Sequence, residues 1–132
     1  MASKVMVHRV KLSGEGIHEV PLEASEHGLV IEVNASTAYL YITNRDFSEI
    51  FDALHLYDRG TADELQNGES AFVVWSSDAE RAGVYYRGRF QAAVDFERHE
   101  ARCRSGFPTL PNTPWLRSGH EWDDELVRGL EP

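Results

Sequence analysis

Cysteine, lysine and long apolar runs are scarce in this 132-residue sequence, and each shortage excludes a class of protein. The single cysteine, Cys103, cannot form a disulfide within the chain, so the fold has to be stable without one. No stretch has the roughly 18 consecutive apolar residues of a membrane-spanning helix, and the N-terminal segment has no apolar region long enough for a signal peptide. We therefore expect a cytoplasmic protein that makes no contact with a membrane.

Acidic residues outnumber basic ones. Thirteen Lys and Arg residues stand against 22 Asp and Glu residues, which gives a formal net charge of −9 at pH 7. Such a charge repels the phosphate backbone of a nucleic acid, so binding to DNA or RNA is not expected. A surplus of carboxylates instead suits a protein that docks onto a basic partner protein.

The length of the chain predicts one globular domain over residues 1–132. A chain of this size buries roughly two-thirds of its unfolded surface, which is enough for a core without a metal or a disulfide. Hydrophobic residues make up 42% of the sequence, a fraction typical of globular rather than disordered proteins.

The motifs that would indicate a cofactor or a metal are incomplete. Gly14 and Gly16 begin a dinucleotide-binding pattern, but Glu19 stands where the third glycine is required. His99 lacks the second histidine of the zinc-protease helix, because Cys103 occupies that position. We expect neither a cofactor nor a metal site.

Several segments are typical of β-strands. Residues Ala71–Trp75 are apolar at every position, which predicts a central strand covered on both faces. Val5–Leu12 alternates loosely and predicts a first strand, while Leu29–Val33 and Thr37–Thr43 predict a hairpin.

A second predicted hairpin follows the central strand. Its arms are Gly83–Tyr86 and Phe90–Phe96, separated by Arg87–Arg89. A three-residue loop would place Tyr86 opposite Phe90 and make one face of the hairpin apolar, so the register favours this loop length.

One segment is ambiguous between helix and strand. Asp46–Phe51 begins like a capped helix, whereas Ala53–Tyr57 has the composition of a strand, and we predict a short helical turn followed by a strand.

The pattern of Trp122–Leu130 predicts a short C-terminal helix. The predicted fold is mainly β, a single antiparallel sheet that is rolled or sandwiched with this helix packed on it. An α+β fold is the alternative if Asp46–Tyr57 is helical throughout.

Five residues are candidates for a ligand site. His55 and Tyr57 share one face of the predicted strand, and together with Trp75 they could line an aromatic pocket with one titratable group. Arg102 and Arg104 belong to an arginine-rich region and could bind an anionic ligand by bidentate hydrogen bonds. The alternatives are core packing for the aromatic residues and pairing with nearby carboxylates for the arginines.

Four short segments carry a resemblance to known proteins. Asp52–Tyr57, Val73–Asp78, Val94–Phe96 and Cys103–Pro108 resemble a family of short bacterial proteins of unknown function. The resemblance implies a bacterial source, and it implies no activity and no catalytic residue.

These observations lead to two competing functions. The first is a non-catalytic protein-binding module, an immunity-type or accessory factor whose acidic surface binds a basic partner. The second is a small-molecule binding protein or an enzyme that uses the aromatic and histidine pocket for an anionic ligand. An exposed edge strand would also allow a homodimer.

Overall fold

The computed structural model describes residues 5–11, 16–22, 25–34, 37–58, 70–76, 78, 80–86, 88–104 and 120–130, and of Val5, Tyr57 and Asp58 it describes only the backbone. Within these ranges the chain forms nine strands and one four-residue 3-10 helix. The strands are β1 (Val5–Lys11), β2 (Gly16–Pro21), β3 (His27–Val33), β4 (Thr37–Asn44), β5 (Ile50–Asp58), β6 (Ser70–Ser76), β7 (Arg81–Tyr86), β8 (Arg89–Asp95) and β9 (Glu100–Cys103), and the 3-10 helix is η2 (Asp124–Val127).

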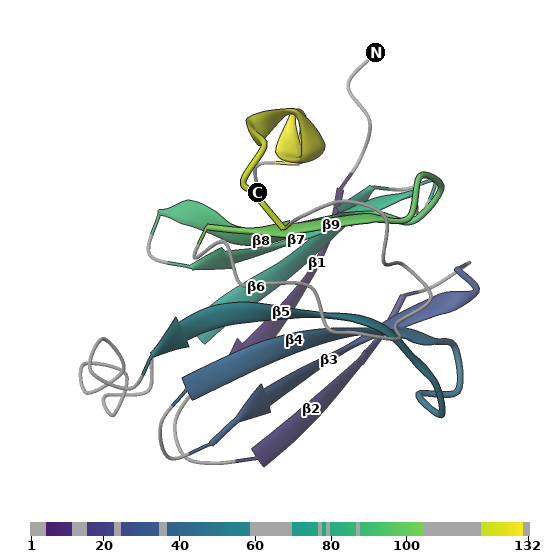
Figure 1. Ribbon diagram of the computed structural model, residues 1–132, viewed down its shortest axis with the longest axis vertical. Helices are drawn as coiled ribbons and strands as arrows, with labels where there is room; N and C mark the ends of the chain where they lie inside the picture. The colour runs from purple at the N-terminus through teal and green to yellow at the C-terminus, as the bar shows by residue number, and fades with distance from the viewer. Residues whose placement is uncertain are drawn as a thin grey trace.

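The strands form two sheets that lie face to face as the layers of a sandwich (Figure 1). One sheet has the order β1-β6-β7-β8-β9 and the other β2-β3-β4-β5, and neighbouring strands are antiparallel. Apolar side chains from both sheets form one core, among them Leu29, Leu40, Leu54, Val73, Val84 and Val94. The predicted antiparallel β fold is confirmed, but the prediction of a single sheet is wrong, because each sheet buries its apolar face against the other.

The alternation of side chains along β3 and β4 explains their position in the sandwich. Leu29, Ile31 and Val33 point to one side of β3 and are buried in the core. Val33 pairs with Ala38 and Leu29 pairs with Ile42, so the predicted hairpin is confirmed.

The hairpin of β7 and β8 closes more tightly than predicted. Tyr86 pairs with Arg89, so its predicted pairing with Phe90 is wrong. An irregularity at Gln91 shifts the register by one residue, and the pairs from Ala92 onward follow the prediction. Because this irregularity is a β-bulge, the hairpin has both a two-residue loop and an apolar inner face. Tyr86 packs in the core, and Phe90 packs on the opposite face of the sheet.

The helical turn predicted over Asp46–Phe51 is wrong. The Asn44 side chain accepts hydrogen bonds from the backbone N–H groups of Ser48 and Glu49 at 2.9 and 3.0 Å. These bonds satisfy the backbone in a tight turn instead of a helix. The following strand is confirmed, and it begins at Ile50.

Two further expectations are wrong within the described residues, and one strand was not predicted. These residues contain no α-helix, so the α+β alternative is wrong, and the C-terminal helix is only the 3-10 turn η2. They also contain no helix that is long and apolar enough to span a membrane. Strand β2 was not predicted, because its segment GIHEVP mixes polar and apolar residues on both faces.

The segment around η2 covers the outer face of the five-stranded sheet (Figure 1). Leu126 and Leu130 are buried there in a second cluster with Phe90. The Arg81 guanidinium donates hydrogen bonds to the backbone carbonyls of Leu126 and Arg128, at 3.3 and 2.9 Å. This sheet is therefore packed on both faces, which explains the continuous apolar run of β6.

A buried polar pair connects the two sheets where β5 and β9 come together. Asp52 of β5 and His120 are both almost fully buried, and His120 Nε2 lies 2.9 Å from Asp52 Oδ2. The backbone carbonyl of His120 accepts a hydrogen bond from the N–H of Cys103 in β9. His120 thus bonds to an edge strand of each sheet.

We predict that Gly83→Ala destabilises the protein. A Cβ atom at Gly83 would lie 2.8 Å from the Phe90 ring and 3.1 Å from the backbone oxygen of Ala92. Such overpacking costs about 1–3 kcal/mol of unfolding free energy, which urea denaturation measures. Gly16→Ala is the control, because no atom lies within 4 Å of its added Cβ. Equal stabilities of the two variants would contradict the tight packing at Gly83.

We also predict that Asp52→Asn lowers the unfolding free energy by about 2–3 kcal/mol, because it weakens a buried polar pair. The control is Glu125→Gln, which removes a contact of similar length, 2.8 Å to Arg128. Both of those side chains are more than half exposed, so the expected loss is below about 1 kcal/mol. Urea denaturation of the two variants tests the difference, and similar losses would refute a bridging role for Asp52.

Candidate functional site

The outer face of the four-stranded sheet carries a regular array of mixed side chains. Because the inner positions of β3, β4 and β5 fill the core, the alternate positions point outward. The strand register arranges them in three rows across the sheet. The rows are Ile17, Glu32, Tyr39 and His55; Glu19, Val30, Tyr41 and Ala53; and Pro21, Gly28, Thr43 and Ile50.

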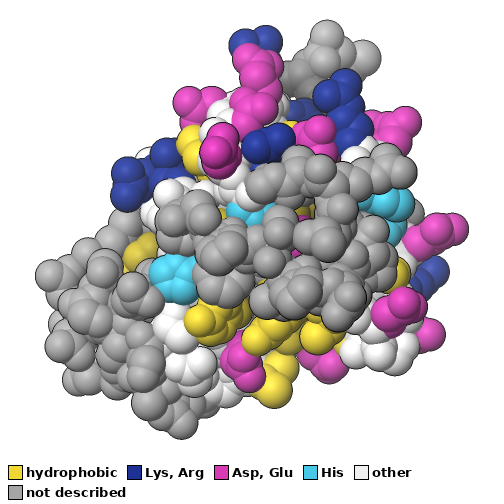
Figure 2. All heavy atoms as spheres, in the orientation of Figure 1, with side chains coloured by type: hydrophobic (Ala, Val, Ile, Leu, Met, Phe, Trp, Pro, Cys, Tyr) yellow, Lys and Arg dark blue, Asp and Glu magenta, His cyan; other side chains and the backbone are white. Residues whose placement is uncertain are grey.

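A groove of about 400 Å³ lies across these rows, and we call it the sheet groove. Its lining residues are Ile17, Glu19, Val30, Glu32, Tyr41, Thr43, Phe47 and Ile50. Ile17 and Ile50 are 67% and 48% exposed, and they are two of the four exposed large hydrophobic side chains among the described residues. Figure 2 shows hydrophobic side chains beside acidic ones on the side of the molecule where Figure 1 places this sheet.

The turn between β4 and β5 builds one wall of the sheet groove. Phe47 has a left-handed backbone conformation, with φ of 59°, and its ring lies over Gly28 of β3. A Cβ at Gly28 would be 2.5 Å from that ring, so only glycine allows the approach. The hydrogen bonds from Asn44 hold the turn that carries Phe47.

A hydrogen bond orders the acidic part of the sheet groove. The Tyr41 hydroxyl donates to Glu32 Oε1 at 2.7 Å. Burial raises the pKa of Tyr41 to about 12, and the hydrogen bond and the charge of Glu32 act in the same direction. Tyr41 therefore remains a neutral donor at physiological pH and orients the Glu32 carboxylate.

The three aromatic residues predicted to form a pocket are placed differently. His55 is half-buried on the outer face of the four-stranded sheet, where its ring meets that of Tyr39 edge-on at 5.6 Å. Trp75 is 6% exposed and lies in the core between the sheets. The backbone of Tyr57 pairs with Ala38, and its side chain lies outside the described structure. The fold thus places His55 and Trp75 on opposite sides of one sheet.

The two predicted arginines lie on the outer face of the five-stranded sheet. Arg102 donates a hydrogen bond to the backbone carbonyl of Glu121 at 2.9 Å. The Arg104 guanidinium lies 4.4 Å from the centroid of the Trp122 ring, and its Nε donates to the carbonyl of Phe90. Both arginines bind the protein's own C-terminal segment.

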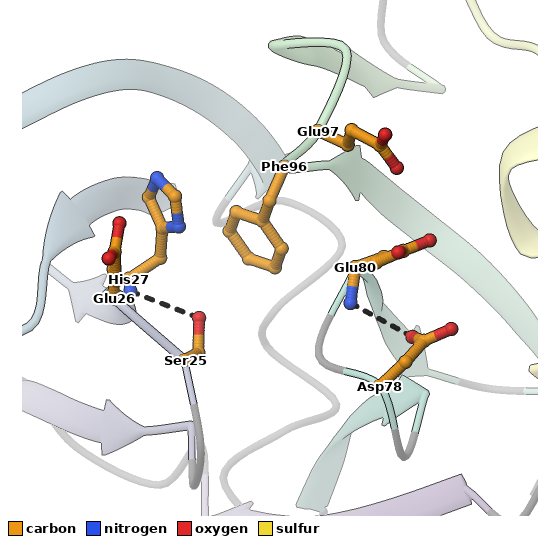
Figure 3. A pocket seen from close by; sticks show the side chains of 7 residues that line it. All are labelled: Ser25, Glu26, His27, Asp78, Glu80, Phe96 and Glu97. Carbon is orange, nitrogen blue, oxygen red and sulfur yellow. Dashed lines mark hydrogen bonds between the residues drawn. The ribbon is translucent and has the colours of Figure 1, made fainter.

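A second and smaller cavity, of about 240 Å³, lies near one end of the sandwich (Figure 3). Its lining residues are Ser25, Glu26, His27, Asp78, Glu80, Phe96 and Glu97. The rings of His27 and Phe96 stack at 4.8 Å, and burial lowers the pKa of His27, with the nearby His99 adding to the effect. The negative charge of Asp78, followed by that of Glu97, raises the pKa of Glu80.

Three carboxylates of this second cavity lie near one another but not against its aromatic rings. In Figure 3 the side chains of Asp78, Glu80 and Glu97 point away from the His27 and Phe96 rings. Within the described part of the chain, no three His, Cys, Asp or Glu side chains come together in a way that could hold a metal ion. The cavity is therefore an acidic depression without an organised set of ligands.

Comparison with protein families gives one informative match. The family described as "Uncharacterized protein conserved in bacteria (DUF2251)" matches residues 12–131. No curated protein and no solved structure matches the chain. The match covers β2 to β9, including the strands that form the sheet groove, and begins immediately after β1.

We predict that Tyr41 stays protonated at about pH 10, where an ordinary tyrosine is half ionised. Replacing Glu32 by Gln should lower the pKa of Tyr41 from about 12, but not fully to 10.0, because burial is the largest cause of the shift. NMR titration of the tyrosine ring carbons measures both values. Glu19→Gln is the control, since the shift comes from burial, Glu32 and Tyr39, and the loss of the Glu19 charge should leave the pKa of Tyr41 nearly unchanged. A pKa near 10 for Tyr41 in the unmodified protein would contradict the partly buried hydrogen bond between Tyr41 and Glu32 in the sheet groove.

Proposed function

The chain belongs to this bacterial family, and we propose that it is a non-catalytic module that binds a basic partner protein in the sheet groove. The observation that carries the proposal is the pairing of two exposed isoleucines, Ile17 and Ile50, with two carboxylates, Glu19 and Glu32, in one groove. No Lys or Arg is among its lining residues. An immunity-type or accessory factor would have such a surface.

The two kinds of side chain have different roles in this proposal. Full burial of an isoleucine side chain contributes about 1.5–3 kcal/mol, so covering Ile17 and Ile50 would supply most of the affinity. Glu19 and Glu32 would select a partner segment in which Lys or Arg stands beside apolar residues, and would exclude acidic segments. The net charge of −9 would speed the encounter with a basic protein.

The chemistry of the cavities favours this function over binding of an anionic small molecule. Carboxylates line both the sheet groove and the second cavity, and neither lining includes a Lys or an Arg. An anion placed in either cavity would be repelled rather than bound. The two arginines predicted to bind an anion, Arg102 and Arg104, bond to the protein's own backbone or ring groups.

Selection from a library of displayed random peptides on the immobilised protein tests the proposal. We expect the recovered peptides to combine Lys or Arg with apolar residues. Their affinity should fall about tenfold or more in the Ile50→Asp variant, because the charge prevents burial of the side chain. The double variant Glu19→Gln/Glu32→Gln should weaken binding and reduce its dependence on salt.

Val7→Asp is the matched control for Ile50→Asp. Val7 is 49% exposed and Ile50 is 48% exposed, but Val7 lies on β1 of the other sheet. The affinity of peptides that bind in the sheet groove should be the same for Val7→Asp as for the unmodified protein. Recovery of acidic peptides, or equal affinity for the protein and its Ile50→Asp variant, would overturn the proposed function.

A further inference from the structure

Strand β1 forms an edge of the five-stranded sheet and is exposed along most of its length. It pairs with β6 through seven residue pairs, from Val5 with Ser76 to Lys11 with Ser70, without any shift of register. Its side chains at positions 6–9 and 11 are exposed, and Met6 and Val7 are 39% and 49% exposed. Among the described strands, β6 is its only neighbour.

Apart from its charges, the edge of β1 has none of the features that commonly prevent pairing with another strand. Edge strands are often protected by a proline, a bulge or short length, and β1 is a regular seven-residue strand without proline. Only its charges, on Arg9 and Lys11, oppose the approach of a further strand. Backbone N–H and C=O groups along such an edge can accept an added strand.

The charge of β1 is opposite to that of the protein as a whole. The first eleven residues contain three Lys and Arg residues and no Asp or Glu, although the net charge of the chain is −9. Both lysines of the sequence, Lys4 and Lys11, are in this segment. A second copy of the same strand would bring like charges together, whereas an acidic strand would be attracted.

From the exposed edge and its charge, we propose that β1 binds an extended acidic segment of a partner protein as an added strand of the five-stranded sheet. Backbone hydrogen bonds supply the affinity, and carboxylates of the segment face Arg9 and Lys11. Apolar residues of the segment lie on the other face of the added strand, beside the exposed side chain of Met6. This surface belongs to the other sheet from the sheet groove, so the inference does not depend on the proposed function.

Fluorescent peptides of alternating Glu and Val test strand addition. An added strand uses the N–H groups of alternate residues, so a peptide N-methylated at one set of alternate residues should lose binding. The peptide methylated at the other set should bind like the unmethylated one. Hydrogen exchange should also slow at alternate β1 amides when the peptide is bound. Fluorescence anisotropy and NMR measure these effects on the full chain.

Charge and site are tested with two protein variants. Arg9→Glu/Lys11→Glu should weaken binding of the Glu/Val peptide about tenfold, because two attractions become repulsions. The variant Ile17→Asp/Ile50→Asp, altered in the sheet groove, should bind this peptide with unchanged affinity. This variant distinguishes a failure of strand addition at β1 from a failure of the proposed function of the sheet groove. Circular dichroism shows whether each variant is folded, and the methylated peptides need no variant at all.

Three results would overturn the inference. One is the absence of binding of the Glu/Val peptide to the unmodified protein, and another is equal binding of the two methylated peptides, which strand addition forbids. The third is a dimer in light scattering in which the β1 amides are protected from hydrogen exchange without any peptide, because a second copy would then occupy the edge. A Lys/Val peptide is the matched control and should not bind.

Discussion

The apolar core lies between the inner faces of the two sheets. It determines which side of each strand is left exposed to solvent. Leu29 and Ile31 of β3 and Leu40 and Ile42 of β4 must point toward the five-stranded sheet, because they are completely buried there. Successive residues of a strand point to opposite sides, so the same burial turns Glu32, Val30 and Tyr41 outward. The sheet groove is in this sense a consequence of the core.

The polar residues of the structure connect parts that the core alone would leave separate. Asp52 and His120 join the sheets where β5 meets β9, and Arg81, Arg102 and Arg104 bind the C-terminal segment to the outer face of the five-stranded sheet. The C-terminal segment covers that face over β7 and β8. The sheet groove exposes apolar groups beside negative charges, and the edge of β1 exposes them beside positive charges. The two exposed regions therefore suit partners of different chemistry.

Local patterns in the sequence predicted the strands well and the site poorly. The run Ala71–Trp75 and the hairpin of β3 and β4 were identified because their own residues carry the signal. Strand β2 was missed, and with it Ile17 and Glu19, since its segment has no clear alternation. His55 was identified and does lie on the outer face of the four-stranded sheet, but Trp75 faces the core, which no local pattern indicates.

The sequence by itself determined that the chain is an acidic, mainly β protein whose first eleven residues carry basic but no acidic side chains, because composition and alternation are properties of neighbouring residues. Only the tertiary structure decided that there are two sheets, that a bulge at Gln91 separates Tyr86 from Phe90, and that Ile17 and Ile50 share one groove. These features depend on which strands pair and in which register. Pairing joins residues that are distant in the chain, so the pattern of any one segment does not contain it.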